Sequence, residues 1–258
     1  MYPILFKLGL LTIYSYGFMV AIGFLIGIFL ALYFARQTGI KSETILDLAL
    51  YVIVAAIVGA RVLYVIGEWP TYLANPIDII MVQKGGLAFL GGLILTIGVV
   101  IFYAHWKKLN LLILLDTITP GTVLGYAIAR LGCFFNGCCF GHPTDSILGV
   151  KFPPGSLAYF QYPGILTHPT QLYSVVVMAI TFLFLLWFWP RRKFAGQVFF
   201  IGLTIYSVYR FVIEYFRFCP DELYWLGLNP GQFISLGLLV IGITGLVLLK
   251  KKNGGGGI

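Results

Sequence analysis

The sequence contains few charged residues, and it has especially few acidic residues and histidines. Charged residues make up 10% of its 258 positions and hydrophobic residues 60%, with only nine acidic residues and three histidines. A soluble domain carries roughly a quarter charged residues, so this composition excludes an ordinary soluble protein. Apolar runs of about 20 residues recur instead, and each could cross a hydrocarbon core about 30 Å thick. We therefore expect an all-α, polytopic membrane protein.

Other features are missing as well. No internal repeat is evident, so the sequence gives no support for an inverted-repeat transporter. No cleavable signal peptide is evident, because the first apolar run is too long and lacks a small-residue cleavage site. The net charge of +8 does not indicate a nucleic-acid partner, because the basic residues lie in short clusters between apolar runs.

Seven apolar segments have the length of roughly 17–25 residues that a transmembrane helix needs. We expect them at Thr12–Phe34, Ile45–Ile66, Leu87–Trp106, Leu111–Leu131, Gln171–Trp189, Phe194–Phe216 and Gln232–Lys250. Basic clusters follow alternate segments: Arg36 and Lys41, Lys107 and Lys108, Arg191, Arg192 and Lys193, and Lys250, Lys251 and Lys252. Because cytoplasmic loops carry the excess of Lys and Arg, the N-terminus is predicted outside and the C-terminus in the cytoplasm.

This threading predicts a single transmembrane domain over residues 1–252 and a flexible tail at 253–258. Two outer loops, at about 67–86 and 133–170, are long. Loops of that length are usually either functional or disordered. The aromatic residues of the second loop favour one that packs at the membrane interface.

Four arginines lie within the predicted spans or at their ends: Arg61, Arg130, Arg210 and Arg217. An arginine near mid-membrane costs about 2.5–3.5 kcal/mol on insertion scales, so it should face a polar cavity or a partner. Arg210 and Glu214 are four residues apart on one helix face, one turn after Tyr206. This stripe is either an ion pair that locks the bundle or a site for an anionic headgroup, since a guanidinium matches phosphate bidentately. With few acids to neutralise the arginines, we expect a pocket for a phospholipid headgroup.

Six motifs occur in order along most of the chain: Ser15-Tyr16-Gly17, Gly59-Ala60-Arg61, the run from Gly85 to Gly92, Ala129-Arg130-Leu131-Gly132 with Asn136, Gly137 and Gly141, the run from His168 to Tyr173, and the run from Arg210 to Arg217. Together they resemble the prolipoprotein diacylglyceryl transferase family. The resemblance implies a seven-helix enzyme of the bacterial inner membrane. It also implies transfer of a diacylglyceryl group from phosphatidylglycerol to the lipobox cysteine of a preprolipoprotein, with release of glycerol phosphate.

The resemblance further implies a polar site. Its expected catalytic residues are Arg130, Arg210, His168, Glu214 and Tyr16, and its expected substrate-binding residues are Arg61, Gly91, Gly92, Asn136, Gly141, Gln171, Tyr173 and Tyr206. Arg130 and Arg210 would hold the phosphate and stabilise the leaving group, while Glu214 would orient Arg210. The glycines would let the backbone approach a ligand closely. The implied partners are phosphatidylglycerol, the preprolipoprotein and membrane lipid, and we expect no cofactor and no metal.

Four positions depart from the family pattern: Leu90 replaces a usual His, Cys133 a usual Asn, Cys138 a usual Glu and Ser174 a common Glu. Because leucine cannot accept a proton, another group would have to activate the acceptor thiol, and His168 or His142 could do so. Two alternatives therefore stay open. One is a phosphatidylglycerol-using enzyme with a different acceptor, and the other is a non-catalytic phospholipid-binding or transport protein.

The four cysteines are all expected on the outer side, where disulfides form and persist: Cys133, Cys138, Cys139 and Cys219. We expect a structural disulfide that joins Cys219 to Cys138 or Cys139. A buried apolar cysteine and a metal site are alternatives, although the spacing lacks the paired C-x-x-C of ordinary zinc sites. A thiol that transiently accepts the diacylglyceryl group is a further alternative.

Overall fold

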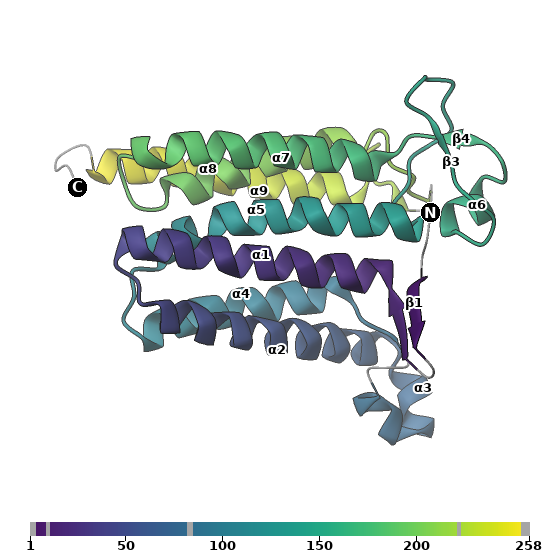
Figure 1. The fold of residues 1–258 in the computed structure, drawn as a ribbon, viewed down its shortest axis with the longest axis horizontal. Coiled ribbons are helices and arrows are strands. Elements are labelled where there is room, and N and C mark those ends of the chain that lie inside the picture. The colour runs from purple at the N-terminus through teal and green to yellow at the C-terminus, as the bar shows by residue number, and fades with distance from the viewer. Residues whose placement is uncertain (1–3, 9–10, 82–84, 221–222, 254–258) are drawn as a thin grey trace. The chain divides into compact units, whose positions relative to one another are not determined.

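A computed structural model describes residues 4–8, 11–81, 85–220 and 223–253. Helices dominate it, and two small antiparallel sheets accompany them (Figure 1). The helices are α1 (Ser15–Thr38), α2 (Ser42–Gly67), α3 (Trp69–Ala74), η1 (Pro76–Ile80), α4 (Phe89–Trp106), α5 (Leu111–Asn136), α6 (Leu157–Gln161), α7 (Thr170–Phe188), η3 (Trp189–Arg191), α8 (Gln197–Ile213) and α9 (Pro230–Asn253). The strands are β1 (Ile4–Leu8), β2 (Leu11–Tyr14), β3 (Val150–Lys151) and β4 (Leu166–Thr167).

Six helices are long and apolar enough to cross a membrane: α1, α2, α4, α5, α7 extended by η3, and α9. Each coincides with a predicted segment to within a few residues. The remaining predicted segment corresponds to α8, which is apolar but has only 17 residues. The helical, polytopic architecture is therefore confirmed, whereas the seventh span and the orientation of the termini stay predictions.

The first predicted segment begins too early. Leu11–Tyr14 forms strand β2, which pairs antiparallel with β1 and sets Phe6 opposite Ile13, so α1 begins only at Ser15. β-Branched and aromatic residues before Ser15 favour this strand.

The predicted outer loops also contain regular structure. The 67–86 region holds the short helices α3 and η1, while residues 82–84 lie outside the described residues. The 133–170 region holds the last turn of α5, then β3, α6 and β4. Of the predicted tail, Asn253 ends α9, and residues 254–258 lie outside the described part of the chain.

The chain divides into two compact units, and the single domain expected over residues 1–252 stays a prediction. One unit runs to Ala31 and resumes at Leu115, and the other spans Leu32–Leu114. In the first unit, α8 packs against both α7 and α9 (Figure 1).

Glycines bring α1 and α5 of the first unit into backbone contact. A Cβ at Gly23 would lie 2.7 Å from the carbonyl oxygen of Gly125, and one at Gly121 would lie 2.5 Å from that of Gly27. Small residues spaced in this way let membrane helices pack closely. The contact fixes the lateral position of α5, whose last turns carry two of the predicted site residues, Arg130 and Asn136.

A buried aspartate determines where α8 begins. The Asp116 carboxylate on α5 accepts hydrogen bonds from the backbone N–H groups of Gly196 at 2.7 Å and Phe199 at 2.8 Å. These are orphan donors of the first turn of α8, and an anion suits that end of a helix. Asp116 therefore holds α8 against α5.

Candidate active site

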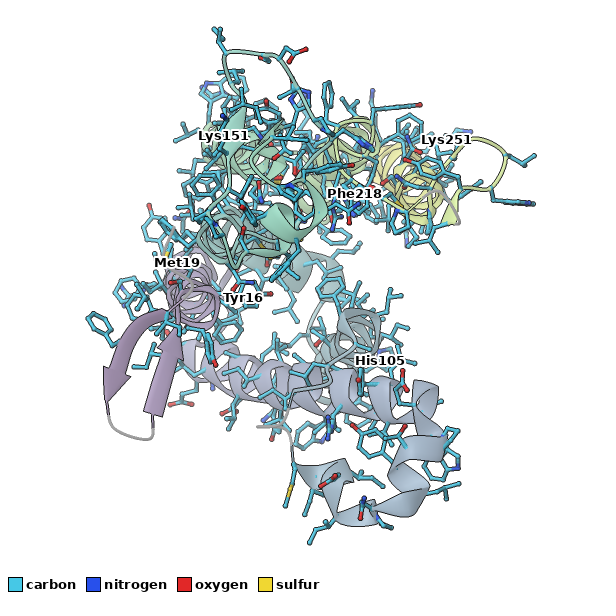
Figure 2. All side chains as sticks on the ribbon, turned by 90° about the vertical axis from the view of Figure 1, so that its right-hand side faces the viewer. Tyr16, Met19, His105, Lys151, Phe218 and Lys251 are labelled. Carbon is cyan, nitrogen blue, oxygen red and sulfur yellow. The ribbon has the colours of Figure 1, made fainter. Side chains whose placement is uncertain are left out.

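Figure 2 labels Tyr16, which is one of ten predicted site residues that belong to the first unit. They are Tyr16, Arg130, Asn136, Gly141, His168, Gln171, Tyr173, Tyr206, Arg210 and Glu214. The end of α5, the start of α7 and the end of α8 meet there through the contacts that follow.

Gly141 lies at the junction of two of the motifs. Its N–H donates to the carbonyl of His168 at 2.9 Å, and Gly141 forms a β-bridge with Arg217. A Cβ at this position would lie 2.3 Å from the carbonyl oxygen of Phe216 and 2.7 Å from the Cβ of His168. Because only glycine fits here, the run from His168 to Tyr173 and the run from Arg210 to Arg217 can both approach the backbone at this position.

The first turn of α7 holds the loop that follows α5. The Thr170 hydroxyl donates to the carbonyl of Cys139, and the Gln171 side-chain NH₂ donates to the carbonyl of Cys138, both at 2.6 Å. Both donor side chains are buried. The Gln171 side-chain nitrogen thus holds the backbone of the loop, while its side-chain oxygen is buried and has no hydrogen-bond partner among the residues that the structure describes.

His168 is oriented by aromatic neighbours. Its Nδ1 lies 3.1 Å from the Tyr173 hydroxyl, and its ring meets the Phe216 ring edge-on with centroids 5.3 Å apart. A hydrogen bond at one ring nitrogen selects the tautomer and so determines the role of the other nitrogen. His168 and Tyr173, two predicted site residues from one motif, therefore form a single unit.

Glu214 is a buried acceptor between two arginines. Its carboxylate pairs with Arg210 one turn earlier and with Arg217 at 3.2 Å. The same carboxylate accepts a hydrogen bond of 2.8 Å from the side-chain amide of Asn229. The i, i+4 pair expected from the sequence is confirmed, and the carboxylate is 4% exposed against 17% and 26% for the arginines. The two guanidiniums are thus the accessible part of the cluster.

Arg130 carries a charge that no acid of the described chain neutralises. Its guanidinium lies over the Tyr126 ring, 4.8 Å from the centroid, and donates to the hydroxyl of the same tyrosine. Its Nε is buried and has no hydrogen-bond acceptor within the described part of the chain. The Tyr126 ring meets that of Tyr206 edge-on at 5.7 Å, which links α5 to α8 beside the charge. The Tyr16 hydroxyl is within electrostatic reach of Arg130.

The cysteines are arranged differently from the prediction. None of the four, all of which lie in the described part of the chain, forms a disulfide, so the expected bond to Cys219 is wrong. Cys133, Cys138 and Cys139 gather with each other instead, because the backbone turns back at Gly137, where φ is +69°. The Asn136 side chain hydrogen-bonds to Cys138.

The thiol of Cys139 lies in an electropositive environment. Its Sγ accepts a hydrogen bond from Arg217 at 3.4 Å. Hydrogen bonds from Cys133 and Cys138 hold the pKa of Cys139 well below its usual range, and the nearby Arg217 and Arg130 lower it further. Burial alone would lower the pKa of Arg217, but Cys139 and Glu214 raise it above its ordinary value.

The other predicted site residues belong to the second unit. Arg61 is buried, and its guanidinium donates to the carbonyls of Ile79, Gly86, Gly85, Asp78 and Met81. A Cβ at Gly91 would lie 2.2 Å from the carbonyl oxygen of Gly59, and one at Gly92 would lie 2.7 Å from that of Ala56. At these two glycines it is the backbone of α2 that approaches closely. The hydrogen-bond donors of Arg61 are used by backbone carbonyls. Their ligand-binding roles stay predictions.

Two residues of the site, Asn229 and Tyr126, were not predicted from the sequence. Asn229 forms a reciprocal capping box at the start of α9, in which its side chain accepts from the Gln232 N–H and the Gln232 side chain accepts from the Asn229 N–H. An Asn three residues before a Gln at the start of an apolar run was the available signal. Tyr126 precedes Arg130 by one helical turn, the same spacing that drew attention to Tyr206.

Over nearly its whole length, the chain is similar to known proteins that share one description. A family model described as prolipoprotein diacylglyceryl transferase matches residues 3–248. The chain is 34% identical over 244 residues to phosphatidylglycerol–prolipoprotein diacylglyceryl transferase 2 of Clostridium perfringens, an alignment covering 95% of this chain and 93% of that protein. It is 35% identical over 258 residues to the phosphatidylglycerol–prolipoprotein diacylglyceryl transferase of Bordetella parapertussis, with 97% and 95% covered. The protein of that name from Geobacter sulfurreducens is 32% identical over 260 residues, with 98% and 97% covered.

Proposed function

Because the chain belongs to the prolipoprotein diacylglyceryl transferase family, we propose that it transfers a diacylglyceryl group from phosphatidylglycerol to the lipobox cysteine of a preprolipoprotein. One structural observation supports this proposal in addition to the family match. Arg130, Arg210 and Arg217 lie in the unit where the family motifs meet, and the buried Glu214 pairs with two of them. The three arginines carry more positive charge than Glu214 neutralises. The phosphodiester of an anionic phospholipid would supply the missing negative charge.

The arginines have distinct parts in this proposal. Arg210 is held by Glu214 and partly exposed, so its fork is preorganised for the phosphate oxygens. Arg130 has no carboxylate partner among the described residues and lies where water is scarce, so its charge would stabilise a developing negative charge more than bulk solvent does. Both guanidiniums would bind the donor and stabilise the glycerol phosphate as it leaves.

The transfer step needs an ionised acceptor. The lipobox thiol gives up its proton, and its sulfur attacks the glycerol carbon that bears the phosphate. A C–S bond forms as the C–O bond to the phosphate breaks, and glycerol phosphate departs with the electron pair. We propose that His168 takes the thiol proton in the tautomer whose Nδ1–H donates to the Tyr173 hydroxyl, at a distance of 3.1 Å, because that tautomer leaves Nε2 unprotonated and able to act as base. Tyr16 and Tyr206 would donate hydrogen bonds to headgroup or ester oxygens.

The proposal includes a place in the cell. We propose seven spans in the bacterial inner membrane, with α8 as the seventh, since its 17 residues reach the lower bound of about 17 for a spanning helix. Basic clusters would then keep the C-terminus in the cytoplasm, and the site would open toward the outer side, where the acceptor is presented.

A defined acceptor peptide tests the proposal. The purified chain in vesicles containing phosphatidylglycerol should add the mass of one diacylglyceryl group to a synthetic lipobox peptide, and a peptide with Ser in place of the Cys should stay unmodified. Consumption of the donor with neither peptide modified would favour the alternative of a different acceptor, which Leu90 motivates. An unconsumed donor that still binds would favour a non-catalytic lipid-binding protein.

A further inference from the structure

Three cysteine side chains meet at one point beside the proposed donor site. The sulfur atoms of Cys133, Cys138 and Cys139 all lie within 4.8 Å of one another. Cys133 is on the last turn of α5, and the other two follow the turn at Gly137. Within the described ranges this is the one group of three or more His, Cys, Asp or Glu side chains close enough to hold an ion.

The surrounding structure holds the backbone of this group in place. The carbonyls of Cys138 and Cys139 accept hydrogen bonds of 2.6 Å from the buried side chains of Gln171 and Thr170. The Cys138 N–H donates to the carbonyl of Cys133 at 3.1 Å, which closes the turn. The sulfurs therefore converge without any change in the backbone, as preorganised ligands do.

The spacing of the sulfurs suits a shared ion. A metal–thiolate bond is about 2.3 Å long, so three sulfurs in a plane around one ion are about 4 Å apart. Separations of up to 4.8 Å reach that value through small rotations of the side chains. A disulfide would instead need two of the sulfurs to approach to about 2.05 Å, which leaves the third thiol without a role.

The charges nearby indicate which ion fits. Arg217 donates to the sulfur of Cys139, and three thiolates bring more negative charge than a monovalent ion removes. The adjacent guanidinium of Arg217 offsets one of the two negative charges that remain. Structural zinc takes four protein ligands, whereas three thiolates suit a soft ion such as Cu(I).

We propose that Cys133, Cys138 and Cys139 bind one Cu(I) ion per chain in a three-coordinate thiolate site. Binding releases the protons of the thiols that are not already ionised. Cys219 takes no part in the site. The proposal departs from the sequence-based expectation of no metal, which rested on the lack of paired C-x-x-C spacing.

Competition with a colorimetric Cu(I) chelator tests the site on the reduced, full-length chain in detergent. We expect one ion per chain, and replacement of Cys133, Cys138 or Cys139 by Ser should weaken binding at least about tenfold. Cys219→Ser is the matched control and should bind as the parent does. Equal affinity in all four variants, or absence of Cu(I) binding by the parent, would overturn the proposal.

A second measurement uses only the parent chain, so it does not depend on whether the variants fold. The parent chain is alkylated with iodoacetamide with and without Cu(I), and each cysteine peptide is quantified by mass spectrometry. Cu(I) should slow the modification of Cys133, Cys138 and Cys139 and leave the rate at Cys219 unchanged. Equal rates at all four cysteines with and without Cu(I) would contradict the site, whatever the transferase assay gives.

Discussion

The Glu214 carboxylate accepts a hydrogen bond from the side-chain amide of Asn229 at 2.8 Å, and this bond joins the end of α8 to the first turn of α9. The same carboxylate pairs with Arg210 and Arg217. Three donors from two segments therefore converge on one buried anion. In the function that we propose, Glu214 positions the arginines and the arginines bind the substrate.

The first prediction concerns Glu214→Gln. Neutralising the carboxylate leaves two guanidiniums without their shared anion, and loss of one partner of a buried ion pair costs about 3–5 kcal/mol. We expect a lower melting temperature in detergent together with loss of donor turnover. Glu43→Gln, at an exposed position in the first turn of α2, is the control and should match the parent. Parent-like stability and turnover in Glu214→Gln would contradict the positioning role.

Arg130→Ala and Arg210→Ala test the phosphate site. Both proteins should fold and insert, but turnover of phosphatidylglycerol should fall about 10²–10³-fold, as when a donor to a developing anion is removed. Arg36→Ala, at an exposed position in the last turn of α1, should retain turnover. Donor turnover at the parent rate in both site variants would leave the arginines a purely structural role.

Gly141→Ala tests the junction of the two motifs. The added methyl group would lie 2.3 Å from the carbonyl oxygen of Phe216, so the backbone that joins His168 to Arg217 must shift. We expect transfer to fall by more than about tenfold, because a misplacement of about 1 Å is costly in catalysis. Gly237→Ala is the control, since a Cβ there meets nothing within 4 Å. If the two alanine variants were equally active, the junction would not set the geometry of the site.

His168→Gln tests the proposed base. Donor binding should be retained, while transfer at neutral pH should fall about a hundredfold, within the usual range for loss of a general base. Raising the pH should restore part of the rate, because a peptide thiol ionises unaided near its pKa of about 8.5. Initial rates across a pH series with a lipobox peptide provide the measurement. A rate that equals the parent's at every pH would exclude His168 as the base.

Arg61→Ala distinguishes the two roles considered for that residue. Its guanidinium binds carbonyls of the segment between α2 and α4, so its loss leaves these acceptors without their shared donor. We expect a lower melting temperature, with the KM for phosphatidylglycerol of the folded protein unchanged. A raised KM at parent-like stability would instead support the substrate-binding role that the family resemblance implies.

Much of the fold was predictable, because long apolar runs need a bilayer or a core and their lengths fix the helices. The i, i+4 spacing of Arg210 and Glu214 likewise required contact on one helix face. The β1–β2 hairpin was missed because hydropathy does not distinguish a strand from the beginning of a span. The apolar residues of Leu11–Tyr14 satisfy both interpretations.

The site was harder to predict, because its contacts join distant segments. Nothing local to Asn229 indicates that its amide reaches Glu214, which depends on how α8 and α9 are connected. The cysteines were misread for a similar reason. Their predicted position on the outer side favoured a long-range bond to Cys219, whereas the turn at Gly137 brings Cys133 to its near neighbours.

The most direct test of the proposed transfer follows both products of one reaction. The chain is incubated with phosphatidylglycerol labelled in both its acyl chains and its terminal glycerol, with and without a lipobox peptide. Our account predicts that glycerol phosphate and diacylglyceryl-modified peptide appear in equal amounts, and that the donor is stable without the peptide. Glycerol phosphate released at the same rate without the peptide, with the peptide unmodified, would contradict it.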